Sequence, residues 1–424
     1  MLRKLLIGSI LTIVVSFYFF PISFVFLPVG LNSKIMLAAL GIAAFIYNCM
    51  RKGSVELSHY TIASAILAVL FSVWCFFSIT VNDYYNDTYA TYIVSYLTWM
   101  AGAYGVYFCL TLAYERVDLD ILTRYLAIVG VFQCVSAILI DNVPAFSDFV
   151  DTFMYQADNY YKVNHRMYGI GAALDPAGVR FSTILILLAH QFSANPKVRG
   201  RDLFQATLLI AFAFITVIGC VISRTTMIGS GMGIAYILIS IIRLRRGGFV
   251  TTKMVRNFFI FALVLTGLIA AGIYLFRTSK PFEGYLRFGF EAFFNWAETG
   301  EFHTGSTDTL NEMWVWPEDM RTWFIGRGTF GVFENDSDIG YCNFILYSGL
   351  IGMTLFSIFF IYCHLVLNTK FRNFAITSLL FIALTFIIWL KVTTDIFFIT
   401  ALLFCIEGDL NEEEPYELEE TEAA

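Results

Sequence analysis

The sequence predicts an all-α fold, a bundle of about twelve helices that cross a membrane. Of the 424 residues, 58% are hydrophobic and only 14% are charged, whereas about a quarter of the residues in a soluble domain are charged. The apolar residues also come in runs of about 20, the length that a helix needs to cross the hydrocarbon core of a bilayer. Because backbone polar groups in lipid must be hydrogen-bonded within their own segment, these runs predict helices rather than open strands.

Twelve apolar stretches are candidates for these spans. In chain order they are residues 5–27, 34–50, 60–81, 91–113, 122–140, 178–194, 204–222, 226–242, 257–276, 339–367, 373–390 and 392–406. The last stretch is short and predicts a tilted or half-buried helix. Residues 1–406 therefore form a predicted transmembrane domain. Residues 407–424, rich in Glu and Asp, form a predicted acidic cytoplasmic tail that is solvated.

Lys and Arg residues mark every second connection between the predicted spans. These clusters lie at residues 3–4, 51–52, 116 and 124, 197–201, 243–256 and 370–372. Short loops rich in Lys and Arg stay in the cytoplasm, so an even number of spans places both termini there. The opposite face then carries two long connections, about 141–177 and 277–338, where function is expected in a compact bundle. Within the second, residues 285–296 predict a helix that lies along the membrane surface.

Three arginines are candidates for an anion site at this outer face. Arg224 lies in a connection too short to lift it far from the membrane, where an arginine is costly unless it pairs with an anion or a carboxylate. Its planar guanidinium suits a phosphate or diphosphate group; the alternative is a side chain that only reaches the lipid headgroups. Arg166 and Arg180 bracket the end of the first long connection, and we expect Arg180 near the mouth of its helix on the same side. Two further candidates precede them, Lys162 and His165.

The triplet Asp336-Ser337-Asp338 leaves three interpretations open. Two carboxylates at this spacing can bind Mg²⁺ or Mn²⁺, one of them can act as a general base or contact substrate, or the triplet only caps the next helix. The preceding stretch from Gly326 to Gly331 matches GxGxxG, but it lacks the strand and helix that a dinucleotide site requires. We therefore interpret it as a glycine-rich turn. No basic patch predicts a nucleic-acid partner, and Gly229 with Gly233 predicts a close helix-packing face.

Taken together, these features resemble the bacterial O-antigen polymerase and ligase superfamily. The resemblance rests on the Arg166 segment, on Ser223-Arg224-Thr225, and on the stretch from Gly326 to Gly352 with its glycine-rich turn, acidic triplet, Gly340-Tyr341 and Gly349-Leu-Ile-Gly352. It covers about residues 160–355. Elsewhere the chain matches only as hydrophobic helices.

The resemblance implies a reaction in the bacterial inner membrane. Members transfer a glycan from undecaprenyl diphosphate to an acceptor hydroxyl at the periplasmic face. The acceptor is a second lipid-linked repeat unit in polymerases and the lipid A core in ligases. Ligases of this superfamily typically carry a histidine just before the Asn-x-x-Leu segment; here that position reads Gly340-Tyr341-Cys342-Asn343, which favours a polymerase over a ligase. The implied partners are the undecaprenyl-diphosphate-linked oligosaccharide, the bilayer and a chain-length regulator.

Eight side chains form the predicted site. The expected catalytic residues are Arg224, Arg166, Asp336 and Asp338. The expected substrate-binding residues are Arg180, Arg327, Tyr168 and Tyr341. The resemblance implies that neither a metal nor a cofactor takes part. The aromatic candidates for stacking on sugar rings, or alternatively for anchoring at the interface, are Trp314, Trp316 and Trp323.

A flippase or transporter of lipid-linked saccharide is the alternative from another functional class. Coupled transporters tend to place ionisable groups at mid-membrane. The centres of the predicted spans contain almost no Asp, Glu, Lys or Arg. This distribution favours the enzyme over an ion-coupled transporter.

Overall fold

The structure is a computed structural model that is almost entirely helical. It describes residues 2–155 without 29 and 56, residues 166–194, 202–247, 259, 262–263, 266–267, 270–274 and 276–410. Two short strands, β1 (Ser23–Phe24) and β2 (Met154–Tyr155), pair antiparallel. The predicted all-α membrane bundle is therefore confirmed as a fold class. The candidates Lys162 and His165, and nearly all of the predicted span 257–276, lie outside the described residues.

Seven of the described helices are long and apolar enough to cross a membrane. They are α2 (Ser33–Lys52), α3 (His59–Val81), α4 (Tyr92–Thr111), α5 (Leu119–Asn142), α8 (Leu174–Ala194), α10 (Asp202–Ile222) and α18 (Gly340–Leu365). The chain is thus a multi-pass membrane protein, and the total of twelve spans stays a prediction.

Four further apolar helices complete the described bundle. They are α1 (Leu2–Phe19), α11 (Thr226–Gly247), α19 (Ala375–Ile388) and α20 (Phe397–Cys405). The nine residues of α20 rise only about 14 Å, less than half of the hydrocarbon thickness. Eight of them are buried, so α20 is an internal helix, in keeping with the half-buried helix expected there.

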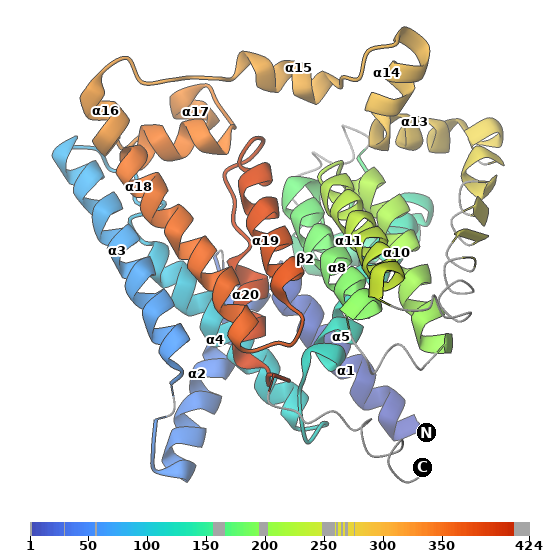
Figure 1. Ribbon diagram of the computed structural model, residues 1–424, viewed down its shortest axis with the longest axis horizontal. Helices are drawn as coiled ribbons and strands as arrows, with labels where there is room; N and C mark the ends of the chain where they lie inside the picture. Colours follow the sequence, from blue (N-terminus) through green and yellow to red (C-terminus); the bar gives the residue numbers. More distant parts are fainter. Residues whose placement is uncertain are drawn as a thin grey trace.

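Five short helices lie across one end of the bundle, and the start of α1 lies at the opposite end (Figure 1). They are α13 (Lys280–Gly289), α14 (Glu291–Thr299), α15 (Gly305–Glu312), α16 (Met320–Ile325) and α17 (Val332–Asn335); we call them the cap. The expected surface helix 285–296 is two helices, because Phe290 leaves the helical conformation (φ −119°, ψ 28°). In the first long connection, α6 (Pro144–Phe153) precedes β2.

The cap is anchored to the bundle at both ends. At the α13 end, the Tyr285 hydroxyl donates to the Asp141 carboxylate at the end of α5, 2.5 Å away. At the α16 end, the Arg321 guanidinium donates to the Val81 carbonyl at the end of α3, 3.0 Å away. The middle of the cap, α14 and α15, therefore spans the distance between two fixed points.

A break in α18 holds the α16 end more firmly. Gly349 has φ 68° and ψ −178° inside this membrane helix, and a Cβ there would lie 2.2 Å from the Phe324 carbonyl of α16. The carbonyls of residues 346–348 accept bonds of 2.7–3.2 Å from the Arg327 and Gly328 amides, the Ser78 hydroxyl and the Trp74 indole. Backbone groups freed by the break are therefore bonded by other segments, as burial in a membrane requires.

Glycines set the close packing of α8 against α11. A Cβ on Gly229 would lie 2.2 Å from the Ser182 Cα of α8, and one on Gly233 would lie 2.7 Å from the Phe212 ring of α10 and 3.3 Å from the Leu185 carbonyl of α8. Gly231, between them, has nothing within 4 Å of such an atom. The predicted packing face thus consists of Gly229 and Gly233, and it brings the outer ends of α8 and α11 together.

At the end opposite the cap, the start of the acidic tail is held by the bundle. The Arg116 guanidinium contacts Glu407 at 3.3 Å. The Arg372 amide donates to the Asp409 carboxylate at 2.8 Å, and the Asp409 amide donates to the Lys370 carbonyl at 3.2 Å. Residues 407–410 are therefore bonded to the bundle instead of solvated as expected, and the rest of the tail lies outside the described residues.

We predict that Gly229→Ala destabilises the protein by about 1–3 kcal/mol, the usual cost of overpacking, because the added methyl group meets the backbone of α8. Gly231→Ala in the same helix should be neutral or slightly stabilising, since alanine is the better helix former. Thermal unfolding of the two purified variants measures the difference. Equal stability of both variants would contradict the packing described for α8 and α11.

Candidate functional site

The candidate site is a pocket of about 430 Å³ between the cap and the outer ends of the helices, within the size range of small-ligand sites. Three of the eight predicted residues line it, namely Arg166, Arg224 and Asp338. Its other lining residues are Leu174, Asp175, Pro176, Ile222, Ser223, Phe288, Ser306, Thr309, Leu310, Met313, Lys391 and Val392. All the lining residues together come from six separate stretches of the chain, 166–176, 222–224, 288, 306–313, 338 and 391–392, so only the folded bundle forms this pocket.

Arg224 lies in the tight turn between α10 and α11. Its Nη1 contacts Glu291 Oε2 of the cap at 2.5 Å, an ion pair that lacks the geometry of a hydrogen bond. Burial lowers the pKa of the Arg224 guanidinium, and the neighbouring Glu291 carboxylate opposes that shift. The turn is packed tightly on α8, because a Cβ on Gly178 would lie 2.5 Å from the Ser223 hydroxyl. The position of Arg224 is thus fixed from both sides.

A phenylalanine of the cap lies against both pocket arginines. The guanidinium carbon of Arg224 is 4.3 Å from the centroid of the Phe288 ring, and that of Arg166 is 5.0 Å from it. Such cation–π contacts orient a guanidinium without using its N–H donors. Phe288 therefore holds two like charges side by side without using their N–H donors.

Lys391 brings a third cation to the pocket. Its Nζ is 2.6 Å from Asp175 Oδ1, and the Thr225 hydroxyl donates to the same oxygen at 2.5 Å. The sequence did not identify Lys391 or Asp175 as site residues. Lys391 is the single residue between two predicted spans, and the role of Asp175 depends on its pairing with Lys391. One feature of the sequence could have identified Lys391. It is a lone lysine in a connection that the alternation of cytoplasmic and outer loops places at the outer face.

The two acidic residues of the triplet have different surroundings. Asp338 lines the pocket and is exposed. Asp336 does not line it and instead has a left-handed backbone (φ 53°) at the C-terminus of α17. Neither side chain caps α18, since the N-cap residue of that helix is Ile339, without a side-chain hydrogen bond. Of the three interpretations, side-chain capping of α18 is excluded, and only Asp338 can contact a pocket ligand directly.

Arg180 and Tyr168 lie away from the pocket lining. Arg180 is on α8, most of whose residues are buried. Its Nη1 donates to the Pro176 carbonyl at 3.1 Å, and its guanidinium lies 5.3 Å from the Phe398 ring centroid. Because α8 is central, this arginine faces the interior of the bundle rather than the outer water. Tyr168 is buried in a small apolar cluster with Ile140.

Arg327 and Tyr341 also lie outside the pocket lining. The Arg327 guanidinium donates to the Thr329 hydroxyl at 2.8 Å and to the Asn335 side chain at 3.1 Å. It therefore braces the glycine-rich turn. The Tyr341 hydroxyl donates to the Phe386 carbonyl at 2.9 Å, which joins α18 to α19.

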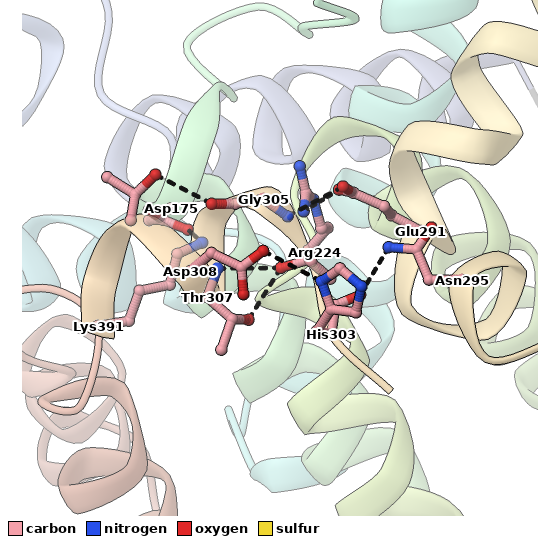
Figure 2. Close-up of polar contacts among 11 residues, drawn as sticks. Asp175, Arg224, Glu291, Asn295, His303, Gly305, Thr307, Asp308 and Lys391 are labelled. Carbon is pink, nitrogen blue, oxygen red and sulfur yellow. Dashed lines mark hydrogen bonds and ion pairs between the residues drawn. The ribbon is translucent and has the colours of Figure 1, made fainter. Parts of the chain in front are cut away.

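The cap closes over Arg224 through a series of polar contacts (Figure 2). Glu291 Oε1 accepts a hydrogen bond of 3.0 Å from the Gly305 amide, the first residue of α15. The His303 ring nitrogen lies 3.0 Å from Asp308, a partner that the sequence did not reveal. The Asn295 side chain donates to the His303 carbonyl at 2.9 Å. Glu291 is thus the residue that joins the bundle arginine to the cap.

Three tryptophans form a stack next to the pocket. Trp314 follows the lining residue Met313, and its ring centroid lies 5.3 Å from that of Trp316. Trp316 lies 5.7 Å from Trp323, with the planes 12° apart. Trp314 and Trp316 are 37% and 45% exposed, so their surfaces are available to a ligand or to lipid.

The pocket brings three cationic side chains together, and three nearby carboxylates balance their charge. Arg166, Arg224 and Lys391 face the carboxylates of Asp175 and Asp338 in the lining, and Glu291 neutralises Arg224 from the cap. Guanidinium groups bind phosphate oxygens in pairs, and a diphosphate can replace a carboxylate partner. Within the part of the chain that the structure describes, no three His, Cys, Asp or Glu side chains form a group that could hold a metal ion.

Comparisons with known proteins add no further assignment. No family model, curated protein or solved structure matches this chain. The functional argument therefore rests on the geometry of the pocket and on the residue patterns.

Proposed function

We propose that this protein is a membrane glycosyltransferase that polymerises undecaprenyl-diphosphate-linked oligosaccharide repeat units at the periplasmic face of the bacterial inner membrane. One observation carries the proposal. Three cationic side chains and an accessible carboxylate line one pocket at the capped end of the bundle. The superfamily resemblance then supplies the reaction for which such a pocket is suited.

The pocket residues have distinct roles in the proposed reaction. The bond between the donor sugar and the diphosphate breaks while the acceptor hydroxyl bonds to the same sugar carbon. Negative charge then collects on the departing diphosphate, and preorganised cations stabilise it. We assign this task to Arg224 and Arg166, which Phe288 orients, and to Lys391. Asp338, exposed in the same pocket, accepts the hydroxyl proton as general base.

The surroundings of the pocket are compatible with a substrate that has a lipid part and a glycan part. The start of α8 and the end of α10 line the pocket, so a polyprenyl chain can remain in the bilayer while its diphosphate reaches Arg224. The tryptophan stack beyond Met313 offers aromatic faces to a glycan leaving the pocket. Aromatic rings bind apolar faces while their polar edges stay wet.

Reconstitution in vesicles with a lipid-linked repeat unit tests the reaction. We expect a ladder of products on a gel in the absence of lipid A core, because the acceptor is a second lipid-linked unit. A single product that forms only with lipid A core would instead establish a ligase. Transfer of the lipid-linked unit between leaflets without any new glycan bond would establish a flippase. In cells that lack the protein, lipid A core capped with a single repeat unit is the matching result.

We predict that Arg224→Ala or Lys391→Ala lowers the rate of chain extension by about 10²–10³, the usual effect of removing one group that stabilises the departing charge. Arg116→Ala is the matched control, because this arginine binds Glu407 and the Gly408 carbonyl at the end of the bundle opposite the cap. Extension rates in vesicles, normalised to the amount of folded protein, measure the effect. If the Arg224→Ala variant made glycan chains of normal length, the proposed role of Arg224 in stabilising the diphosphate would be wrong.

EDTA should leave the rate of chain extension unchanged in the same vesicles. The reason is that the proposed stabilisation of the diphosphate comes from fixed cations of the chain itself. A loss of activity with EDTA that added Mg²⁺ or Mn²⁺ restores would return the acidic triplet to a metal-binding role.

A further inference from the structure

One carboxylate oxygen in the pocket wall joins three separate segments of the chain. Asp175 Oδ1 accepts hydrogen bonds from the Lys391 ammonium at 2.6 Å and from the Thr225 hydroxyl at 2.5 Å. The ammonium is itself 3.5 Å from the same hydroxyl. Asp175 lies at the start of α8, Thr225 in the turn between α10 and α11, and Lys391 in the connection from α19 to α20. Asp175 therefore contacts one pocket cation directly and the neighbour in sequence of another, Arg224.

The backbone around Asp175 is tightly constrained. Leu174, the residue before it, has φ 50°, a left-handed conformation that a leucine rarely adopts and that persists only where the surroundings impose it. Three residues further along α8, a Cβ on Gly178 would lie 2.7 Å from the Thr225 Cβ. The start of α8 and the turn that carries Arg224 are thus in close contact. Asp175 is a fixed acceptor at the end of a central helix.

The contact with Thr225 also fixes the turn of Arg224. The Thr225 side chain is only 3% exposed. Its carbonyl accepts a hydrogen bond of 3.1 Å from the Ser182 hydroxyl of α8. Because its hydroxyl is bonded to Asp175 as well, Thr225 is attached to α8 at two points. Arg224 is the adjacent residue, so its backbone position depends on both bonds.

Lys391 depends on an anchor more than the pocket arginines do. Its four-carbon stem is flexible, and its ammonium lacks the planar fork of a guanidinium. An aromatic ring of the cap orients both arginines, whereas Asp175 contacts the lysine. The backbone of this connection packs on α18, because a Cβ on Gly340 would lie 2.9 Å from the Trp389 Cα and 3.0 Å from the Val392 carbonyl. Contact with α18 thus places the backbone near Lys391, and Asp175 places its ammonium.

Two roles are open to a carboxylate in a pocket proposed for an anion. If Asp175 only balances charge, it repels the ligand and weakens binding. If it is an anchor, it orders the lysine before the ligand arrives, so the cost of ordering that side chain does not fall on binding. An ammonium has three N–H donors, of which Asp175 and Thr225 occupy two. One donor of Lys391 then remains for a ligand, as an anchor requires.

We propose that Asp175 is a positioning residue, which holds Lys391 and the turn of Arg224 in the arrangement that binds the departing diphosphate. This role rests on the proposed glycan transfer and adds to it the residue that orders two of its cations. Asp175 acts through Lys391 and Thr225 rather than on the reacting sugar.

A double-mutant cycle distinguishes an anchor from a residue that only balances charge. The full chain in nanodiscs is titrated with inorganic pyrophosphate at constant ionic strength. Apparent affinity follows from the rise in melting temperature, because a ligand that binds only the folded state raises it. In the parent, Lys391→Ala should lower this affinity at least about tenfold, the usual loss for a hydrogen bond between charged groups. In the Asp175→Asn background it should cost less than about threefold, because the ligand must then order the lysine itself.

A residue that only balances charge predicts the opposite order, since an unpaired lysine attracts the anion more strongly. A larger loss in the Asp175→Asn background, equal losses in both backgrounds, or no binding of pyrophosphate by the parent overturns the proposal. Asp120→Asn is the matched control background. Asp120 is also an aspartate in the first turn of a membrane helix and is paired with a cation, Arg124, but α5 begins at the end opposite the cap. In this background the loss from Lys391→Ala should equal that in the parent.

Substitutions of Thr225 test the second contact of Asp175. Thr225→Ser retains the hydroxyl and should bind pyrophosphate within about twofold of the parent. Thr225→Val has the same shape without the hydroxyl, and it should lower the affinity at least about fivefold, because the turn of Arg224 loses a bond to α8. Equal affinities of the two variants would overturn the role of this contact.

The rate of chain extension, measured over the same cycle, separates the positioning role from the proposed function. We expect Asp175→Asn to lower kcat at least about tenfold with a smaller change in KM, since misplaced groups cost rate more than binding. A product ladder from the parent with equal Lys391→Ala losses in both backgrounds leaves glycan transfer in place and overturns the role of Asp175. The expected order of pyrophosphate affinities without any ladder supports the role of Asp175 and overturns glycan transfer.

Discussion

The structure depends on one constraint, that a backbone group freed inside a membrane must find a partner within the protein. The break at Gly349 frees carbonyls inside α18, a helix long and apolar enough to cross a membrane, where water is scarce. The glycine-rich turn and α3 supply the donors. The turn directly follows α16 and precedes Asp338. The hydrogen bonds to the freed carbonyls therefore also position the cap and one wall of the pocket. The conformation of Gly349 thus helps to position the α16 end of the cap.

The sequence predicted those features that depend on local periodicity and on single glycines. Runs of apolar residues predicted the helices, and Gly229 with Gly233 predicted a close helix-packing face, which the structure places against α8 and α10. The same reading identified Arg166, Arg224 and Asp338, which are far apart along the chain yet line one pocket. In each case a residue type was unusual for its surroundings, an arginine near lipid or an acidic residue before a helix.

The features that it missed depend on contacts between distant segments. The ion pair of Lys391 with Asp175 joins residues 216 positions apart, and no local sequence pattern predicts this contact. Arg180 was expected at the outer face because its place in the span was near the end. Its side chain turns inward because α8 is surrounded by other helices.

Glu291 binds two partners at once, Arg224 in the bundle and the Gly305 amide in the cap. An anion that occupies Arg224 and the carboxylate of Glu291 are therefore competitors for one guanidinium. Thermodynamic linkage makes such competition reciprocal: by whatever factor the closed cap weakens anion binding, the bound anion weakens closure of the cap by the same factor. An anion bound at Arg224, as proposed, would therefore be linked through this ion pair to the position of α14 and α15.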